Sequence, residues 1–146
     1  MSLTKMNRNR DDVLQLIDNG PERLAENIAK LDTNSIIIVA LMSDVGEIFA
    51  FYVNEGYRSD YSTDRKKYEL IAARLAVGFG AALATDKDGL VSETEALAII
   101  RRNTIHYYTK IPHAKKPTIV AVWFNRGNTN VTEMSDRIRK YFETIS

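Results

Sequence analysis

The sequence predicts an α+β domain in which a five-stranded antiparallel sheet carries helices on both faces, in the order α-β-β-α-β-β-β-α. Three observations lead to this prediction. The run SIIIVALMSDVGEIFAFYV at 35–53 contains two apolar segments of strand length around a short polar centre. Three further apolar segments of that length follow at 96–100, 105–111 and 118–124. Segments with the apolar spacing of helices precede, separate and follow these strands.

The run at 35–53 is too interrupted to be a membrane span. Such a span needs about 20 apolar residues with few charges, whereas Asp44 and Gly46 break this run at its centre. Both residue types favour tight turns because they accept unusual backbone dihedrals. We therefore expect antiparallel strands at about 35–42 and 47–54. The first is apolar on both faces, which predicts a central position covered on both sides.

Three helices are expected to supply this cover. The helix at 21–31 begins with Pro21, a residue suited to the first helical position. The helix at 131–145 follows Asn130, which has capping-box spacing to Glu133. These two helices are expected on one face of the sheet, and a helix at 64–85 on the other. The polar stretch at 54–63 is expected to be a loop.

The helix at 64–85 is unusual because it is apolar on two sides. From Leu70 to Ala84 it reads LIAARLAVGFGAALA, with Arg74 as its only charge. One apolar face contains Ile71, Leu75, Phe79 and Ala82, and a second contains Leu70, Ala73, Val77, Ala81 and Ala84. Because one face is enough to pack on the sheet, the second favours contact with another protein, most simply a second copy.

Composition limits the range of functions. A length of 146 residues fits one domain, expected over 21–146, with 1–20 as an extension or short helix. There is no cysteine, so disulfides and thiolate chemistry are excluded. The first twenty residues carry charges throughout and lack a signal-peptide core, which favours a cytoplasmic location. A net charge of +1 gives no overall attraction to nucleic acid or anionic lipid.

No motif predicts a catalytic, cofactor or metal site. Gly78-Phe79-Gly80 lacks the preceding strand and third small residue of a dinucleotide fingerprint. The acidic stretch at 86–89 places its glycine at position four, where a calcium loop needs it at six. His106 and His113 have no ligand partner at metal-site spacing, and no nucleophile motif is present.

Basic and aromatic residues are mixed in the stretch RRNTIHYYTK at 101–110. Such a mixture is found in platforms for single-stranded nucleic acid. In a strand, however, successive side chains point to opposite faces, which divides this set between the two sides of the sheet. Together with the net charge, this favours a solvated hairpin end, and we expect no nucleic-acid partner.

The order and content of these segments resemble the Roadblock/dynein light chain family, whose fold is shared with longin and profilin-like domains. The resemblance covers roughly 21–145. It rests on IAKLDTNSIIIVALMSDVGEIFAFYV as first helix and hairpin, on the Ala-rich second helix, on ALAIIRRNTIHYYTKI as third and fourth strands, and on PTIVAVWFNRGNTN as last strand and turn.

The resemblance implies a non-enzymatic module that forms homodimers, or heterodimers with a paralogue. In that family the sheets join at the third strand and the second helices pack together. The family also implies a scaffold or regulator, commonly of small Ras-like GTPases. Carried over to this chain, the dimer contact is expected at Ala73, Ala76, Val77, Gly80, Ala81, Leu97 and Ile99, with the joined edge around 97–100.

A sensor domain of the PAS or GAF kind is the alternative, since it also combines a five-stranded sheet with flanking helices. It predicts a closed ligand cavity above the sheet. The aromatic residues available to line such a cavity are Phe49, Phe51, Tyr107 and Trp123.

Overall fold

The structure is a computed structural model that describes residues 20–145 apart from 113 and 115. Residues 1–19 of the extension expected at 1–20, and His113, lie outside these residues. The described elements are α2 (Pro21–Ala29), β1 (Ile36–Ser43), β2 (Ile48–Val53), the 3₁₀ turn η1 (Glu55–Tyr57), α3 (Arg58–Tyr61), α4 (Arg65–Ala84), the 3₁₀ turn η2 (Thr85–Asp88), β3 (Ala96–Ile100), β4 (Thr104–Lys110), β5 (Thr118–Asn125), the 3₁₀ turn η3 (Arg126–Asn128) and α5 (Val131–Ile145).

The five strands form one antiparallel sheet in the order β2-β1-β5-β4-β3, which confirms the predicted fold class. The fully apolar strands β1 and β5 lie inside the sheet and are buried along almost their whole length. This is the position that their lack of a polar face predicts. The shorter strands β2 and β3 form the two edges.

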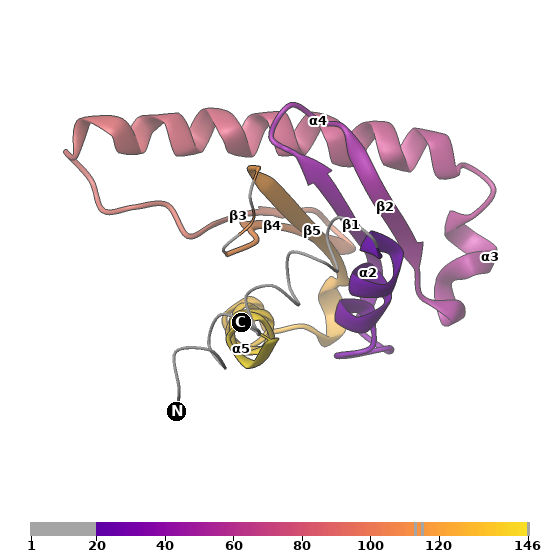
Figure 1. Cartoon of the computed structure of the whole chain (residues 1–146). Helices are drawn as coiled ribbons and strands as arrows, with labels where there is room; N and C mark the ends of the chain where they lie inside the picture. The colour runs from indigo at the N-terminus through magenta and orange to yellow at the C-terminus, as the bar shows by residue number, and fades with distance from the viewer. Residues whose placement is uncertain (1–19, 113, 115, 146) are drawn as a thin grey trace.

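The helices cover the sheet as expected, with α2 and α5 on one face and α4 on the other (Figure 1). Leu24 of α2 and Ile138 of α5 are buried with one set of strand side chains. Phe79 of α4 is buried with the opposite set, which includes Trp123. Glu133 donates its amide N–H to Asn130 Oδ1 at 3.1 Å, which confirms the predicted cap of α5.

A β-bulge in β2 interrupts the simple alternation of its side chains. Leu41 pairs with Ala50 and Met42 pairs with Ile48, so Phe49 is the additional residue. As a result Phe49 and Ala50 both contact the core beneath α2 and α5, whereas Ile48 and Phe51 contact the core beneath α4.

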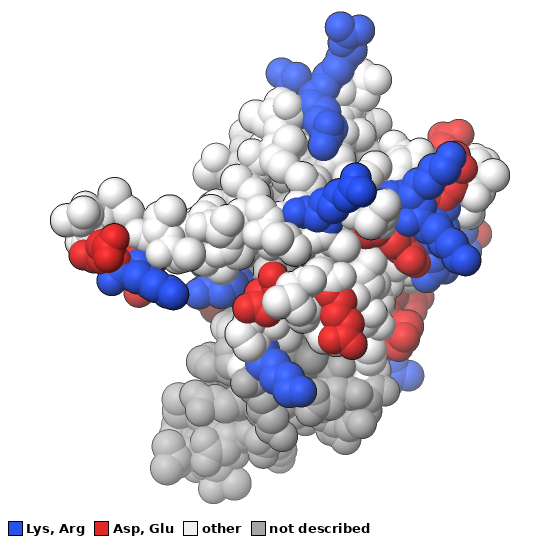
Figure 2. All heavy atoms as spheres, turned by 90° about the horizontal axis from the view of Figure 1, so that it is seen from above, with Lys and Arg blue, Asp and Glu red and all other residues white. Residues whose placement is uncertain are grey.

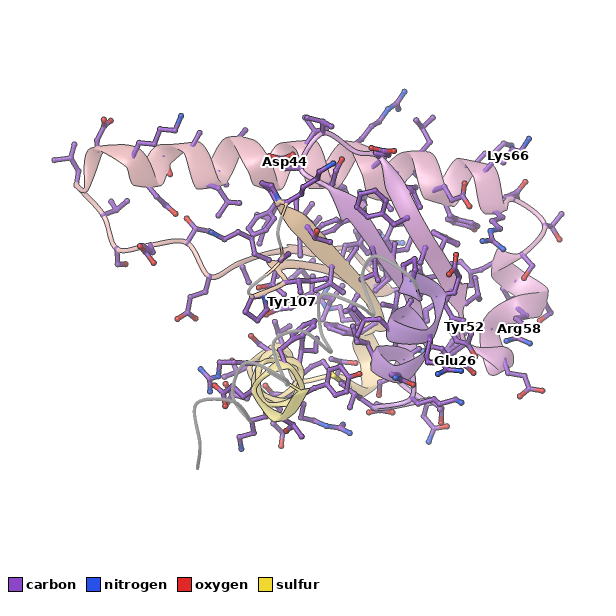
Figure 3. All side chains as sticks on the ribbon, viewed as in Figure 1. Glu26, Asp44, Tyr52, Arg58, Lys66 and Tyr107 are labelled. Atoms are coloured by element: carbon purple, nitrogen blue, oxygen red, sulfur yellow. The ribbon has the colours of Figure 1, made fainter. Side chains whose placement is uncertain are left out.

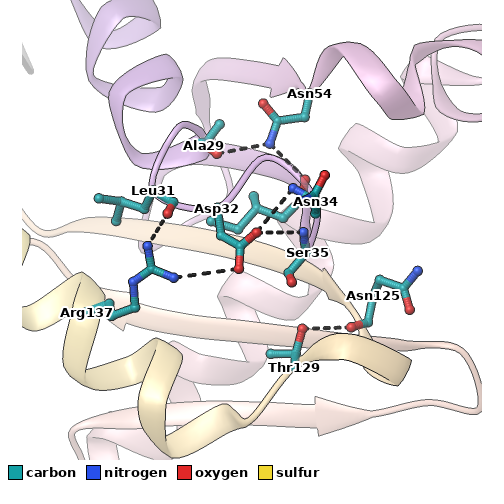
Figure 4. Close-up of polar contacts among 10 residues, drawn as sticks. Ala29, Leu31, Asp32, Asn34, Ser35, Asn54, Asn125, Thr129 and Arg137 are labelled. Carbon is teal, nitrogen blue, oxygen red and sulfur yellow. Dashed lines mark hydrogen bonds and ion pairs between the residues drawn. The ribbon is translucent and has the colours of Figure 1, made fainter.

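Polar contacts hold the connection between α2 and β1 (Figure 4). Asp32 Oδ1 accepts the amide N–H groups of Asn34 at 3.1 Å and Ser35 at 3.0 Å. Arg137 of α5 lies 3.6 Å from the other carboxylate oxygen of Asp32 and donates to the carbonyl of Leu31. These contacts fasten α5 to the connection between α2 and β1.

The stretch expected to be a loop at 54–63 instead contains η1 and α3. Contacts between tyrosine rings account for the helical structure of this stretch. The rings of Tyr57 and Tyr61 meet edge to face with centroids 6.4 Å apart, and Tyr61 lies 4.9 Å from Tyr68 of α4. Side chains four residues apart lie next to each other on a helix surface, so contact between the rings of Tyr57 and Tyr61 favours one helical turn.

Candidate protein-interaction surface

The outer side of α4 is an apolar surface without cover in the single chain. Leu70 and Val77 are 52% and 51% exposed, and Gly78 and Ala81 are also exposed. Arg74 is the charged residue among them. Seen from above, the middle of α4 is mostly uncharged apart from one basic side chain, and other charged side chains lie toward its two ends (Figure 2). We call Leu70, Val77, Gly78 and Ala81 the outer face of α4.

The inner side of α4 packs on the sheet through Ala72, Ala76 and Phe79, which are fully buried. The predicted assignment of faces is therefore partly wrong, because Ile71 was expected to share a face with Phe79 and is 36% exposed. Ala76 was expected at a contact between subunits, but its side chain is used within its own chain. Small residues at Ala72 and Ala76 allow the helix to approach the strands closely.

The hairpin turn between β1 and β2 lies against one flank of α4, as the position of Asp44 in Figure 3 shows. Gly46 has a φ of +85°, and a Cβ on it would lie 3.2 Å from the carbonyl oxygen of Ala73. A Cβ on Gly80 would lie 3.5 Å from the carbonyl oxygen of Asp44. Ala73 and Gly80, both predicted for an intermolecular contact, therefore border their own hairpin, while Val77 and Ala81 remain exposed.

Sequence reasoning placed the turn at 43–46 but did not identify how Ser43 holds it. Ser43 Oγ accepts the amide N–H groups of Val45 at 3.3 Å and Glu47 at 3.0 Å. Serine hydroxyls form hydrogen bonds to nearby backbone N–H groups in turns, and this tendency is the signal that could have indicated the role of Ser43.

Strand β3 offers a second unpartnered feature, because it pairs with β4 alone and leaves one edge free. Leu97 and Ile99, both predicted for the dimer contact, are half-buried. Ile100 is 60% exposed. A free, largely apolar edge is a natural place for another strand to add, since its N–H and C=O groups lack partners.

The chain between α4 and β3 forms a projection that we call the arm, residues 85–95. Together with the end of α4 it extends beyond the sheet (Figure 1). Leu90 and Val91 on the arm are 87% and 61% exposed. The arm is closed at its base by Asp86, whose carboxylate accepts the amide N–H of Thr94 at 2.9 Å and the hydroxyl of Thr94 at 2.8 Å. These bonds lower the pKa of Asp86 because they stabilise its charged form.

The sequence predicts no membrane span, but one helix of the structure is long and apolar enough to be considered as one. Among the described residues, the helical stretch Arg65–Asp88 is long and apolar enough to cross a membrane by length and composition, and only 17% of its most apolar window is buried. The core helix of a soluble protein can pass the same test. Lipid cannot surround this helix in the observed fold, because Ala72, Ala76 and Phe79 face the sheet.

The ligand cavity expected for a sensor domain is not formed by the four aromatic residues named for it. Phe51 and Trp123 pack beneath α4, whereas Phe49 and Tyr107 pack on the opposite side of the sheet. Tyr107 points toward α5 in Figure 3, and its hydroxyl lies 2.8 Å from Ser135 Oγ. The bulge at Phe49 and the alternation along β4 are the reasons for this division.

The residues considered for metal or nucleotide binding occupy ordinary structural positions where the structure describes them. No group of three or more His, Asp or Glu side chains suited to a metal occurs in the part of the chain that the structure describes. Gly78 and Gly80 lie inside α4. His106 is buried and stacks on Trp123 with ring centroids 3.9 Å apart, and its Nε2 lies 3.1 Å from Thr104 Oγ1. Burial and the positive charge of Arg101 lower the pKa of His106 to about 4.

No protein-family model matches the sequence, and no curated protein does. Solved structures do match. The gliding protein MglB of Thermus thermophilus superposes with a TM-score of 0.63 at 11% identity, over 87% of this chain and 89% of that one. A structure of MglB with a tetrameric arrangement gives 0.62 at 12% identity, over 87% and 90%. A Roadblock/LC7 domain from Streptomyces avermitilis gives 0.61 at 11% identity, over 85% and 92%. The chain therefore has the Roadblock/LC7 fold.

Proposed function

We propose that this chain is a non-catalytic, cytoplasmic interaction module that self-associates through the outer face of α4 and the free edge of β3. The observation that carries the proposal is the exposure of Leu70 and Val77 on a helix whose inner side is already packed. Burial of apolar area stabilises an association by roughly 25 cal/mol per Å². Two copies of this face brought together would bury the surface that one copy leaves in water.

Self-association agrees with the assembly of one protein of similar fold, since MglB is known in a tetrameric arrangement. The outer face of α4 and the edge of β3 both lie clear of the helices α2 and α5, which cover the other side of the sheet. A second copy, or a paralogue with the same features, can therefore approach without displacing any described helix. The interface residues that we retain are Ala73, Val77, Gly80, Ala81, Leu97 and Ile99, and we omit Ala76 because it is buried internally.

The activity that we assign to the assembled form is binding of a regulatory protein, with small Ras-like GTPases as the first class to test. Support comes from the fold, whose resemblance to the Roadblock/dynein light chain family implies such partners. A dimer also presents a continuous sheet surface with two copies of each loop, which suits a scaffold.

The first experiment measures the oligomeric state of the full chain by sedimentation at micromolar concentrations. The wild type is expected to be a dimer or larger. The double variant Val77→Glu/Ala81→Glu is expected to be a folded monomer, because two carboxylates cannot be buried in an apolar contact without partners. Lys140→Glu is the matched control, since Lys140 is exposed on α5 at the opposite side of the sheet. A wild type that stays monomeric would contradict the proposal.

A second variant tests the edge of β3 separately. The amide N–H of Arg101 donates to the carbonyl of Thr104 at 2.8 Å, and in an antiparallel ladder the alternation from this bond directs the N–H of Ala98 away from β4. Ala98→Pro therefore removes a free donor while leaving the pairing with β4 intact. Weaker self-association of a folded Ala98→Pro variant is the expected result.

The partner class is tested with purified small Ras-like GTPases loaded with GDP or with a non-hydrolysable GTP analogue. The wild type is expected to bind one nucleotide state more tightly, and the monomeric variant to bind weakly. Co-flotation with lipid vesicles is the parallel test of the apolar helix. Flotation of the wild type without any protein partner would assign the outer face of α4 to a lipid surface instead.

A further inference from the structure

A pocket of about 630 Å³ lies at one end of the sheet, outside the self-association surface. Three segments distant in the sequence form its walls: η1 with α3, the turn between β3 and β4, and the junction of β5 with η3. Ile37 of β1 is also part of its lining. The volume is within the range of small-molecule sites, about 300–1,000 Å³. No residue of α4 lines this pocket.

Two of the walls are joined by backbone hydrogen bonds, so the pocket is formed without a ligand. Arg126 donates its amide N–H to the carbonyl of Asn103 at 3.0 Å, and its Nη1 to the carbonyl of Arg101 at 3.1 Å. Asn125 Oδ1 accepts the amide N–H of Gly127 at 3.0 Å. These bonds fix the β3–β4 turn beside η3, and a preformed site loses less entropy when a ligand binds.

The third wall is aromatic. Tyr57 and Tyr61 line the pocket and are half-buried. Tyr57 is held in place because its hydroxyl donates to the carbonyl of Asn34. Tyr61 is held between Tyr57 and Tyr68, and burial raises its pKa, so its phenol is neutral near pH 7. Fixed, neutral rings of this kind offer faces on which a planar ligand can stack.

The charged side chains of the lining leave an excess of positive charge. Arg102 and Arg126 line the pocket and are exposed. Neither forms an ion pair within the described part of the chain. Asp60 is the acidic residue of the lining, and Arg101 lies close enough to affect the pKa of His106. Guanidinium groups bind phosphate oxygens in a two-point geometry, which an ammonium group cannot do.

We propose that this pocket binds a small planar aromatic ligand with a phosphate group, that is, a mononucleotide. The base would stack on the tyrosine wall, and the phosphate would accept hydrogen bonds from the guanidinium groups of Arg102 and Arg126. Asn103, Asn125 and Asp60 supply hydrogen-bonding groups for the sugar and the edge of the base. A nucleoside alone would contact only the tyrosines, and inorganic phosphate alone would contact only the arginines. Each should therefore bind much more weakly than the mononucleotide.

The signal for this pocket in the sequence was the basic and aromatic stretch at 101–110, but only its first residues take part. Arg102, Asn103 and Thr104 line the pocket, whereas Tyr107 and Tyr108 are buried farther along β4. The tyrosines of the pocket come instead from the stretch expected to be a loop. The proposal does not depend on self-association, because its lining residues lie outside α4 and β3.

The experiment titrates the full-length chain, labelled with ¹⁵N, with AMP and GMP, and separately with adenosine and inorganic phosphate. At least one mononucleotide is expected to shift amide signals of the 101–104 turn at sub-millimolar concentration, with each half-probe binding roughly ten-fold or more weakly. Inorganic phosphate binding as tightly as both mononucleotides would overturn the proposal. So would the absence of shifts at millimolar nucleotide.

Variants assign the two halves of the ligand. Arg102→Gln is expected to weaken mononucleotide binding by about ten-fold, with little effect on adenosine. Tyr61→Leu should weaken the binding of the mononucleotide and also of adenosine, because both stack their base on this ring. Lys140→Gln on α5 is the control that also removes a positive charge, since Lys140 is exposed and is not among the lining residues. The side chain of Arg102 has no hydrogen bond or ion pair within the described residues, so Arg102→Gln should fold normally. Equal affinities of Arg102→Gln and the control would also overturn the proposal.

Discussion

Asn54 is a buried polar residue at the end of β2, and its side-chain amide satisfies two backbone carbonyls. Nδ2 donates to the carbonyl of Ala29 at 3.0 Å and to that of Ile36 at 2.8 Å. The carbonyls belong to the end of α2 and the start of β1, as Figure 4 shows. A single amide thus connects a helix, a central strand and an edge strand at one corner of the domain.

Replacement of Asn54 with alanine is expected to lower the free energy of unfolding by about 2 kcal/mol, because two buried carbonyls lose their donor. Urea unfolding measures the change. Asn34→Ala is the control, since Asn34 is exposed and its side chain forms no hydrogen bond among the described residues. Equal stability of the two variants would show that water replaces the amide of Asn54 without loss.

His106 makes the stability of the fold depend on pH. In the unfolded chain its pKa is near 6.5, and in the fold it is about 4, because burial and Arg101 disfavour the charged ring. The unfolded state therefore takes up a proton first as the pH falls. The neutral ring leaves stability unchanged above pH 6.5, and stability is lost between pH 6.5 and 4.

Replacement of His106 with phenylalanine should remove this pH dependence while keeping a ring against Trp123. Between pH 7 and pH 5 the wild type is expected to lose about 2 kcal/mol more stability than the variant. Unfolding in urea at the two pH values measures the difference. The other titratable groups are common to both proteins, so they largely cancel. Parallel losses in the two proteins would mean that His106 is solvated in the fold.

At the scale of elements, two glycines make it possible to measure the contact between the β1–β2 turn and α4 separately from the cost of a left-handed backbone. Gly46 and Gly89 both have positive φ, +85° and +67°. A Cβ on Gly46 would approach the Ala73 carbonyl oxygen to 3.2 Å, whereas a Cβ on Gly89 would have nothing within 4 Å. The two glycines therefore share the backbone requirement and differ in their surroundings.

Gly89→Ala is expected to destabilise the fold by about 1 kcal/mol through its backbone alone. Gly46→Ala should cost more, by roughly 1–3 kcal/mol in addition, because α4 and the hairpin must separate. Thermal and urea unfolding measure both changes. A Gly46→Ala variant no less stable than Gly89→Ala would show that the hairpin yields to α4 without a measurable cost.

The strands and the main helices could be predicted because local chemistry specifies them. The β-branched run of β1, the turn residues Asp44 and Gly46, and the cap at Asn130 each act over a few residues. The bulge at Phe49 has no such signal, since Ile48 to Val53 is apolar whichever way the residues point. The order of α3 depends on contacts of Tyr61 with Tyr68, which are visible only once α4 is in place.

At the scale of the whole molecule, the arm is expected to contribute to assembly and not to the stability of one chain. Leu90 and Val91 are exposed at its tip. The double variant Leu90→Ser/Val91→Ser should keep the thermal midpoint of the wild type at concentrations where the protein is monomeric. Its self-association should weaken by several-fold, measured by sedimentation. A lowered midpoint of the monomer would show instead that the arm packs on its own domain.

The two candidate sites differ in how far the sequence indicated them. The outer face of α4 could be predicted, because the composition of one helix shows that it has more apolar surface than one sheet can cover. The pocket was indicated only in part, by the basic and aromatic stretch at 101–110, since its walls come from 57–61, 102–104 and 125–127. Only the strand order places these segments together, and nothing local in them specifies that order.

The position of β5 affects the way in which the chain is made. The sheet consists of a hairpin of β1 and β2, a hairpin of β3 and β4, and β5 between them. The central strand is thus the last of the five strands to leave the ribosome, and until residues 118–125 emerge the two hairpins have no shared neighbour. A nascent chain of this protein carries the edge of β1 uncovered until β5 follows it, whereas the edge of β4 waits only for the residues between β4 and β5. The emergence of β5, and not the appearance of any earlier segment, is the moment at which the sheet can close.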